Sequence, residues 1–170
     1  GAVFTMTTHA IGAHDTVQDL HDALSTSAAS PLLSVIDDLA HQRAVAAPQD
    51  DTKASYAAKI TKADAAIDWH DDAMRIDAQV RAFCAWPTAY ARTPDDVVMR
   101  IFSGRFDKTP TNMPPGSMVS IDNGALCVAC GQGQYYIERI QLPGKKAMNV
   151  DDWLRGNPTG IHIGEVLGHG

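Results

Sequence analysis

The stretch Ile76–Tyr90, I-D-A-Q-V-R-A-F-C-A-W-P-T-A-Y, decides the fold of this chain. Ile76, Val80 and Phe83 recur at spacings of four and three residues, which places them on one face of a helix. The stretch therefore predicts an amphipathic helix with a narrow apolar stripe. Any amphipathic helix that ends in a turn would carry the same pattern, so its packing partner has to come from the rest of the chain.

Both ends of this helix carry signals in the sequence. Asp71 or Asp72 can cap its start, because a short polar side chain there can accept a backbone N–H. Trp86-Pro87 ends it, since the residue before a proline is pushed out of helical geometry. Beyond Tyr90 the chain alternates apolar and polar residues in short runs, as strands do. We expect the helix to plug or flank a small β-barrel.

Length and composition favour a folded protein. With 170 residues, of which 45% are hydrophobic and 20% charged, the chain can form one ordinary domain or two small ones. No apolar run approaches the roughly 20 residues that span a membrane, and no secretory leader is expected. The cysteines are Cys84, Cys127 and Cys130, an odd count that favours reduced thiols and a cytoplasmic location.

The net charge of -6 is unevenly distributed. The chain up to Lys53 holds two cations and seven aspartates, a balance of -5, so the remainder carries only -1. The last two-thirds can therefore present a basic face, although the charge balance does not define one.

The first third predicts a strand and helices. Residues Ala2–Met6 are expected to form a short strand, and a helix should begin near Thr16. A second helix should run from Pro31 to near Arg43, separate from the first or continuous with it through a kink. Residues 44–55, with a proline and two aspartates, are interpreted as a linker.

The second half predicts short strands joined by tight turns. The expected strands are Val97–Phe102, extending as far as Phe106, then Ser117–Ile121, Ala125–Cys130 and Gln134–Gln141, followed by a short helix through Leu154. D-N-G and G-Q-G separate them, and such triplets are typical of hairpin turns. The pattern predicts a mixed α/β fold with a five-stranded barrel of the oligonucleotide-binding (OB) type.

No self-sufficient active site is visible in the sequence. Cys127 and Cys130 form a C-x-x-C, but no second ligand pair accompanies it, so we expect no metal and read the thiols as structural. The seven histidines form no known metal or catalytic motif, and no phosphate-binding glycine loop is present. We therefore predict no catalytic residue in this chain.

Cations are the remaining candidates, because lysine and arginine contact RNA phosphates without reading sequence. The candidate RNA-binding residues are Lys59, Lys62, Arg81, Arg92, Lys145, Lys146 and Arg155, with Arg100 and Arg105 as further members of the cationic set. Lys59 and Lys62 would be neighbours if they share a helical turn. Lys145-Lys146 follows a Pro-Gly turn. For any single lysine, a solvated surface position explains the sequence as well.

Three blocks of the sequence carry a family resemblance. They are Tyr56–Trp69 (Y-A-x-K-I-T-K-x-D-A-x-I-D-W), Arg81–Tyr90 (R-A-F-x-x-W-P-x-A-Y) and Gln141–Met148 (Q-x-P-G-K-K-x-M). In order and spacing they resemble the C-terminal half of bacterial methionyl-tRNA formyltransferase. The run D-T-x-x-x-L-H-D-x-L from Asp15 resembles the end of that family's formyl-transfer domain. The chain departs from the family pattern at Cys84–Ala85 and at Gln132.

The resemblance implies a two-domain enzyme of translation initiation. A Rossmann-like N-terminal domain would use 10-formyltetrahydrofolate, and a C-terminal OB barrel would hold initiator Met-tRNA. Residues 1–43 would then be the remnant of the formyl-transfer domain, 44–55 the linker and 56–170 the tRNA-binding domain. The family's catalytic residues have no match here, so the chain alone is expected to be inactive and to bind no cofactor. The apolar faces within residues 1–43 could also support self-association.

Two other functions remain open from the sequence. The chain could be the matching domain of a relative that formylates a nucleotide sugar, or that hydrolyses or oxidises formyltetrahydrofolate. It could also be a non-catalytic interaction module. The P-G-K-K-x-M loop and the pair Lys59 and Lys62 favour tRNA as the partner.

Overall fold

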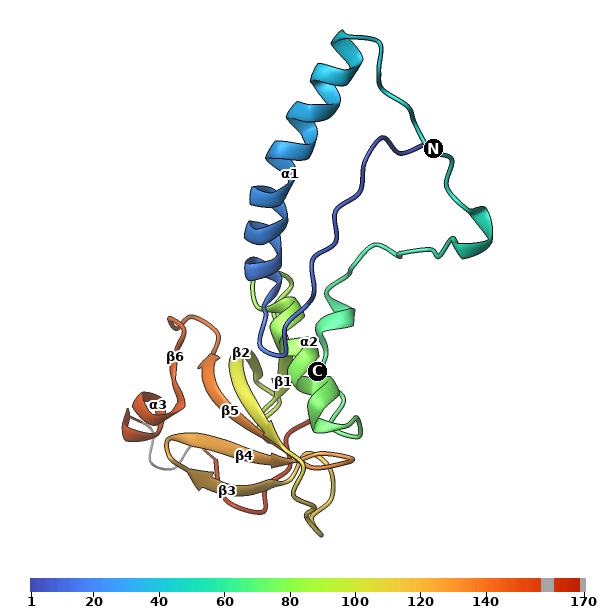
Figure 1. Ribbon diagram of the computed structural model, residues 1–170. Coiled ribbons are helices and arrows are strands. Elements are labelled where there is room, and N and C mark those ends of the chain that lie inside the picture. Colours follow the sequence, from blue (N-terminus) through green and yellow to red (C-terminus); the bar gives the residue numbers. More distant parts are fainter. Residues whose placement is uncertain (157–160, 169–170) are drawn as a thin grey trace. The chain divides into compact units, whose positions relative to one another are not determined.

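A computed structural model describes residues 1–156 and 161–168 of the chain (Figure 1). The chain divides into two compact units, Gly1–Lys59 and Ile60–Gly170.

The first unit is built around one long helix, α1, Val17–Ala40. Thr16 caps it in a capping box: the Thr16 hydroxyl accepts the Asp19 N–H at 3.3 Å, and the Asp19 carboxylate accepts the Thr16 N–H at 2.9 Å. Pro31 lies inside the helix. The two helices expected from the sequence are thus one continuous helix, the second of the two arrangements considered.

The strand expected at Ala2–Met6 was a wrong prediction. Only Val3 pairs, through an isolated antiparallel bridge to Ala47 with both N···O distances at 2.9 Å. A short 3-10 helix, η1, Asp51–Lys53, follows. A strand needs a neighbour to complete its hydrogen bonds, and within this unit only one residue of the stretch has such a neighbour.

No residue of α1 is buried within the structure. Five of its large apolar side chains are about half exposed or more: Leu24, Leu32, Leu33, Ile36 and Leu39. An exposed apolar helix face of this kind usually marks a surface that another element covers.

The second unit is a curled antiparallel sheet flanked by helices (Figure 1). Its strands are β1 Tyr90–Arg92, β2 Val98–Asp107, β3 Met118–Asp122, β4 Ala125–Ala129, β5 Gln134–Gln141 and β6 Met148–Asn149. The strand order is β1-β2-β5-β4-β3, and β6 pairs with β5 beside this path. The β3–β4 hairpin turns at Asn123 and Gly124, whose φ angles of 47° and 75° suit the predicted D-N-G turn.

A C-terminal segment, residues 164–168, bridges the two edge strands of this sheet. Gly168 exchanges two backbone hydrogen bonds with Arg92 of β1, at 3.1 and 2.9 Å. The Met118 N–H of β3 donates to the Glu165 carbonyl at 2.8 Å. The segment therefore connects both edges of the curled sheet, which gives the unit a barrel-like form. The sequence did not predict this segment, nor the short strands β1 and β6.

The helix that decided the prediction is α2, Ala73–Phe83, and it flanks the sheet rather than plugging it. Asp72 caps it by accepting the Met74 N–H at 2.7 Å. Ile76 and Val80 of the predicted stripe are fully buried, and the helix packs on β2 and β5. The cap at Asp72, the burial of Ile76 and Val80 and the packing beside the sheet were predicted correctly, whereas Phe83 of the predicted stripe is only half-buried.

The core lies between α2, the sheet and a last helix, α3, Val150–Gly156. Its largest fully buried side chains include Trp69, Tyr135, Ile67, Met99, Ile101, Leu126, Ile137 and Ile140. The fold is mixed α/β, as the sequence predicted.

Candidate nucleic-acid interface

The predicted pair Lys145 and Lys146 lies exposed on the loop between β5 and β6. The Lys145 N–H donates to the Leu142 carbonyl at 3.1 Å, which closes a turn around Gly144 at φ +72°. The Gln141 side-chain amide donates to the Lys145 carbonyl at 2.8 Å. The backbone beneath these lysines is thus hydrogen-bonded to the end of β5.

Lys59 and Lys62 do not share a helical turn. The short 3-10 helix η2 covers Ala63–Ala65, and Lys62 is its N-cap residue. Lys59 precedes this helix in a stretch without secondary structure, and it is the last residue of the first unit. The neighbour relation expected from an i, i+3 spacing therefore does not apply, because that spacing brings side chains together only on a helix.

The three predicted arginines all pair with carboxylates of their own chain. Arg81 pairs with the buried Asp77 at 2.8 Å, and the Arg81 side chain is only 24% exposed. Arg92 pairs with Asp96 at 3.0 Å, and Arg155 pairs with both Asp151 and Asp152. The aspartates four residues before Arg81 and Arg155 were visible in the sequence, and helix spacing would have predicted both pairs.

Arg100, which the sequence analysis named only as a further cation, and Arg139, which it did not name, are both exposed. Neither has a carboxylate within ion-pair distance among the described residues. Arg100 lies between the buried Met99 and Ile101 on the outer face of β2, and Arg139 is exposed beside the buried Ile140, where a bulge in the β2–β5 register interrupts the alternation of β5. Alternation could have predicted the exposure of Arg100, whereas the exposure of Arg139 depends on the bulge, and the lack of an acidic neighbour depends for both on the strand pairing.

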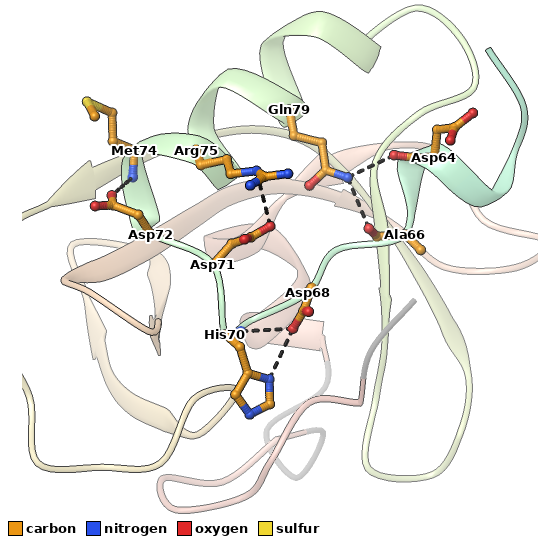
Figure 2. A network of polar contacts seen from close by, with 9 residues as sticks. All are labelled: Asp64, Ala66, Asp68, His70, Asp71, Asp72, Met74, Arg75 and Gln79. Carbon is orange, nitrogen blue, oxygen red and sulfur yellow. Dashed lines mark hydrogen bonds and ion pairs between the residues drawn. The ribbon is translucent and has the colours of Figure 1, made fainter. Parts of the chain in front are cut away.

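The segment before α2 is held by a network of polar contacts (Figure 2). Gln79 of α2 donates from its side-chain amide to the carbonyls of Asp64 and Ala66, at 2.9 and 3.0 Å. The Asp64 carboxylate in turn accepts the Thr61 N–H at 2.6 Å and the Thr61 hydroxyl at 2.8 Å. These bonds hold the pKa of Asp64 below its ordinary value. They also fix the backbone directly after Lys62.

His70 and its neighbouring aspartates serve this local structure. Figure 2 shows the Asp68 carboxylate against both the backbone N–H and the ring of His70, at 2.9 and 3.0 Å. Asp71 pairs with Arg75 of α2 at 3.4 Å, and Asp72 is the helix cap. The acid and base side chains of this stretch thus hold a loop and a helix start, and the cap is one of the two that the sequence predicted.

The buried thiols of Cys127 and Cys130 stay protonated at neutral pH. Burial raises the pKa of Cys130 to about 12, and burial likewise raises the pKa of Cys127. A thiol in that state is a poor nucleophile and a poor metal ligand. Among the residues that the structure describes, no group of three or more His, Cys, Asp or Glu side chains could hold a metal ion. Within the same residues, no helix combines the length and apolar character needed to cross a bilayer.

Comparison with known proteins assigns the family. The profile of the formyl transferase C-terminal domain matches residues 59–158. This chain belongs to that family. The methionyl-tRNA formyltransferase of Legionella pneumophila strain Corby is 35% identical over 167 residues, which cover 98% of this chain and 53% of the relative. The chain thus spans about half the length of the curated relatives it matches.

Solved structures share the fold of this chain. A variant of HypX from Aquifex aeolicus superposes with a TM-score of 0.69 at 15% identity, over 95% of this chain and 29% of that chain. HypX from Aquifex aeolicus in complex with tetrahydrofolic acid gives a TM-score of 0.57 at 16% identity, over 76% of this chain and 23% of that chain. At such identities the likeness concerns the fold alone.

The formyl transferase C-terminal match contains all seven predicted RNA-binding residues, from Lys59 to Arg155. Arg100 and Arg139 also lie within it. The long helix α1 lies outside the family match but inside the stretch shared with the Legionella formyltransferase.

Proposed function

We propose that this chain is the C-terminal part of a methionyl-tRNA formyltransferase and that it holds initiator Met-tRNA during translation initiation. A partner domain would transfer the formyl group from 10-formyltetrahydrofolate to the methionyl amino group. The observation that carries the proposal is the relation to methionyl-tRNA formyltransferases over 98% of the chain.

The geometry supports a role in holding RNA. Lys145 and Lys146 are exposed on a loop whose backbone is hydrogen-bonded at Leu142 and Gln141. A loop held in this way loses little conformational entropy on binding, so its charges are already positioned for phosphates. Lys59 and Lys62 are further contacts in this proposal, since neither has an ion-pair partner among the described residues.

Arg81, Arg92 and Arg155 take a lesser place in the proposal. Each already neutralises a carboxylate, so a phosphate would have to compete with that partner or add to it. We propose them as weaker contacts to the tRNA than the exposed lysines. The finer assignment of the curled sheet as an OB barrel also belongs to the proposal, as do the roles of residues 1–43, 44–55 and 56–170.

The experiment that tests the proposal is filter binding with labelled initiator tRNA, compared with a plain RNA duplex, at two salt concentrations. We expect the chain to bind the tRNA with an affinity that falls steeply as salt rises. We expect no formyl transfer by the chain alone, because no catalytic set is proposed within it. Absence of tRNA binding at low salt would overturn the proposal and favour a sugar-nucleotide or formyltetrahydrofolate enzyme, or an interaction module.

A further inference from the structure

The arginines of this protein fall into two groups. Six pair with carboxylates within the chain: Arg43, Arg75, Arg81, Arg92, Arg105 and Arg155. The other two, Arg100 and Arg139, have no carboxylate within ion-pair distance among the residues described in the structure. The six paired arginines are largely neutralised by their carboxylates, so they attract a bound anion only weakly. Arg100 and Arg139 keep their full attraction for an anion.

The two unpaired arginines are neighbours across the sheet. In the β2–β5 register Arg100 lies opposite Gln141, and Ile101 lies opposite Ile140. Ile101 and Ile140 are fully buried, so Arg100, Gln141 and Arg139 all point to the outer face. Arg139 is two residues from Gln141 on β5 and lies opposite Ser103 in the same register, with a β-bulge between this pair and the Ile101–Ile140 pair, so Arg100 and Arg139 lie on the same pair of strands.

Gln141 lies at the centre of this group. Its amide oxygen accepts a long, 3.5 Å hydrogen bond from Arg100, and its amide nitrogen donates to the Lys145 carbonyl at 2.8 Å. Beside it lies a hollow of about 380 Å³, lined by Val98, Arg100, Gln141, Leu142, Pro143 and Gly144. Figure 1 shows β2 and β5 side by side, with the loop to β6 at the end of β5. The outer face therefore combines three cations with a polar centre and a recess.

Two cations held as near neighbours repel each other, and no acid relieves this within the described chain. A bound polyanion would relieve it, because successive phosphates can meet successive cations. Arginine also suits phosphate, since its planar fork can donate two parallel hydrogen bonds.

We propose that Arg100, Arg139 and Lys145, arranged around Gln141 on the outer face of β2 and β5, form a binding face for the phosphodiester backbone of tRNA. This inference rests on the proposed function for the identity of its partner. It places two of the strongest phosphate contacts on strands, at positions outside the seven candidate RNA-binding residues that the sequence predicted. Contacts of this kind position the RNA without reading its bases.

The test compares two double variants of the full chain in tRNA filter binding across a salt series. Arg100→Gln/Arg139→Gln removes both unpaired arginines. Arg43→Gln/Arg75→Gln is the matched control, because it makes the same change in net charge at two exposed, ion-paired arginines. Circular dichroism and the urea midpoint verify that both variants are folded.

We expect the first variant to flatten the slope of log K against log salt by about 1.5 to 2 units, since two phosphate contacts are lost. The control should keep the slope of the unaltered chain. Equal slopes for the two variants, with the unaltered chain still binding tRNA, would overturn this inference and leave the proposed function in place. An unaltered chain that does not bind tRNA would overturn both.

Discussion

Replacing Tyr135 with phenylalanine should stabilise this protein. The Tyr135 side chain is fully buried, and its hydroxyl has no hydrogen-bond partner among the described residues. A Cβ added at Gly104 would lie 2.6 Å from that hydroxyl, which shows how closely the strand backbone packs against it. Burying a hydroxyl without a hydrogen bond costs about 1 to 3 kcal/mol.

The substitution Tyr135→Phe removes this cost and keeps the ring in place. We therefore expect the free energy of unfolding to rise by about 1 to 2 kcal/mol. In urea denaturation the midpoint should move to higher concentration with an unchanged m-value, because the buried surface stays the same. The melting temperature should rise by about 2 to 4 °C for each kcal/mol.

The neighbouring tyrosine provides the control. Tyr136 is half-buried on the opposite face of β5, and its ring lies 4.5 Å under the Arg105 guanidinium. Tyr136→Phe keeps that ring contact but removes the hydrogen bond between the Tyr136 hydroxyl and the Cys127 thiol, so the free energy of unfolding should fall by up to about 1 kcal/mol rather than rise. A loss of 1 kcal/mol in Tyr135→Phe would refute the reasoning, because it would show that the buried hydroxyl is hydrogen-bonded in solution.

Three further outcomes are expected. The double substitution Lys145→Ala/Lys146→Ala should make the salt dependence of tRNA binding shallower by about 1.5 to 2 units, equally for initiator and elongator tRNA; an unchanged slope would reduce this loop to a solvated turn. Asp72→Ala should lower the free energy of unfolding by about 1 kcal/mol in urea titrations, whereas Asp72→Asn, which can still cap the helix, should keep most of the stability of the unaltered chain. Equal losses in the two variants would contradict the capping role. Burial raises the pKa of Cys130 to about 12, so the unfolded chain loses this proton first as pH rises above the ordinary thiol value near 9. The free energy of unfolding should therefore be highest below pH 9 and fall between pH 9 and 12, and it should fall less steeply in Cys130→Ala. Parallel curves of the free energy of unfolding against pH in the two proteins would argue against this thiol as a cause.

Much of the fold follows from local patterns in the sequence. The 3.6-residue stripe of Ile76 and Val80 predicted both α2 and the face it buries. Strand β5, Gln134–Gln141, was predicted residue for residue, because flanking turns bound an alternating run. What local patterns missed were pairings between distant residues, such as Gly168 with Arg92. A strand as short as β1 has too few residues to show a period.

The candidate interface was predicted less completely than the fold. Composition and spacing identified the Lys145–Lys146 loop, which the structure places exposed on a hydrogen-bonded turn. The sequence does not reveal which cations lack an acidic partner, because Arg100 and Arg139 become neighbours only through the β2–β5 register. The sequence gives the charge of each residue directly, whereas the carboxylate that neutralises this charge is known only from the tertiary structure.

The segment 164–168, which bridges β1 and β3, has a consequence for synthesis of the protein. A ribosome delivers the chain from its N-terminus, so this segment emerges after every strand to which it bonds. Until then the nascent chain presents two open strand edges, which are templates for pairing with other chains. At about 5 to 20 residues per second, the stretch from β3 to this segment takes seconds to appear. During those seconds, chaperones or the charged side chains of the nascent domain itself have to keep the two open edges from aggregating.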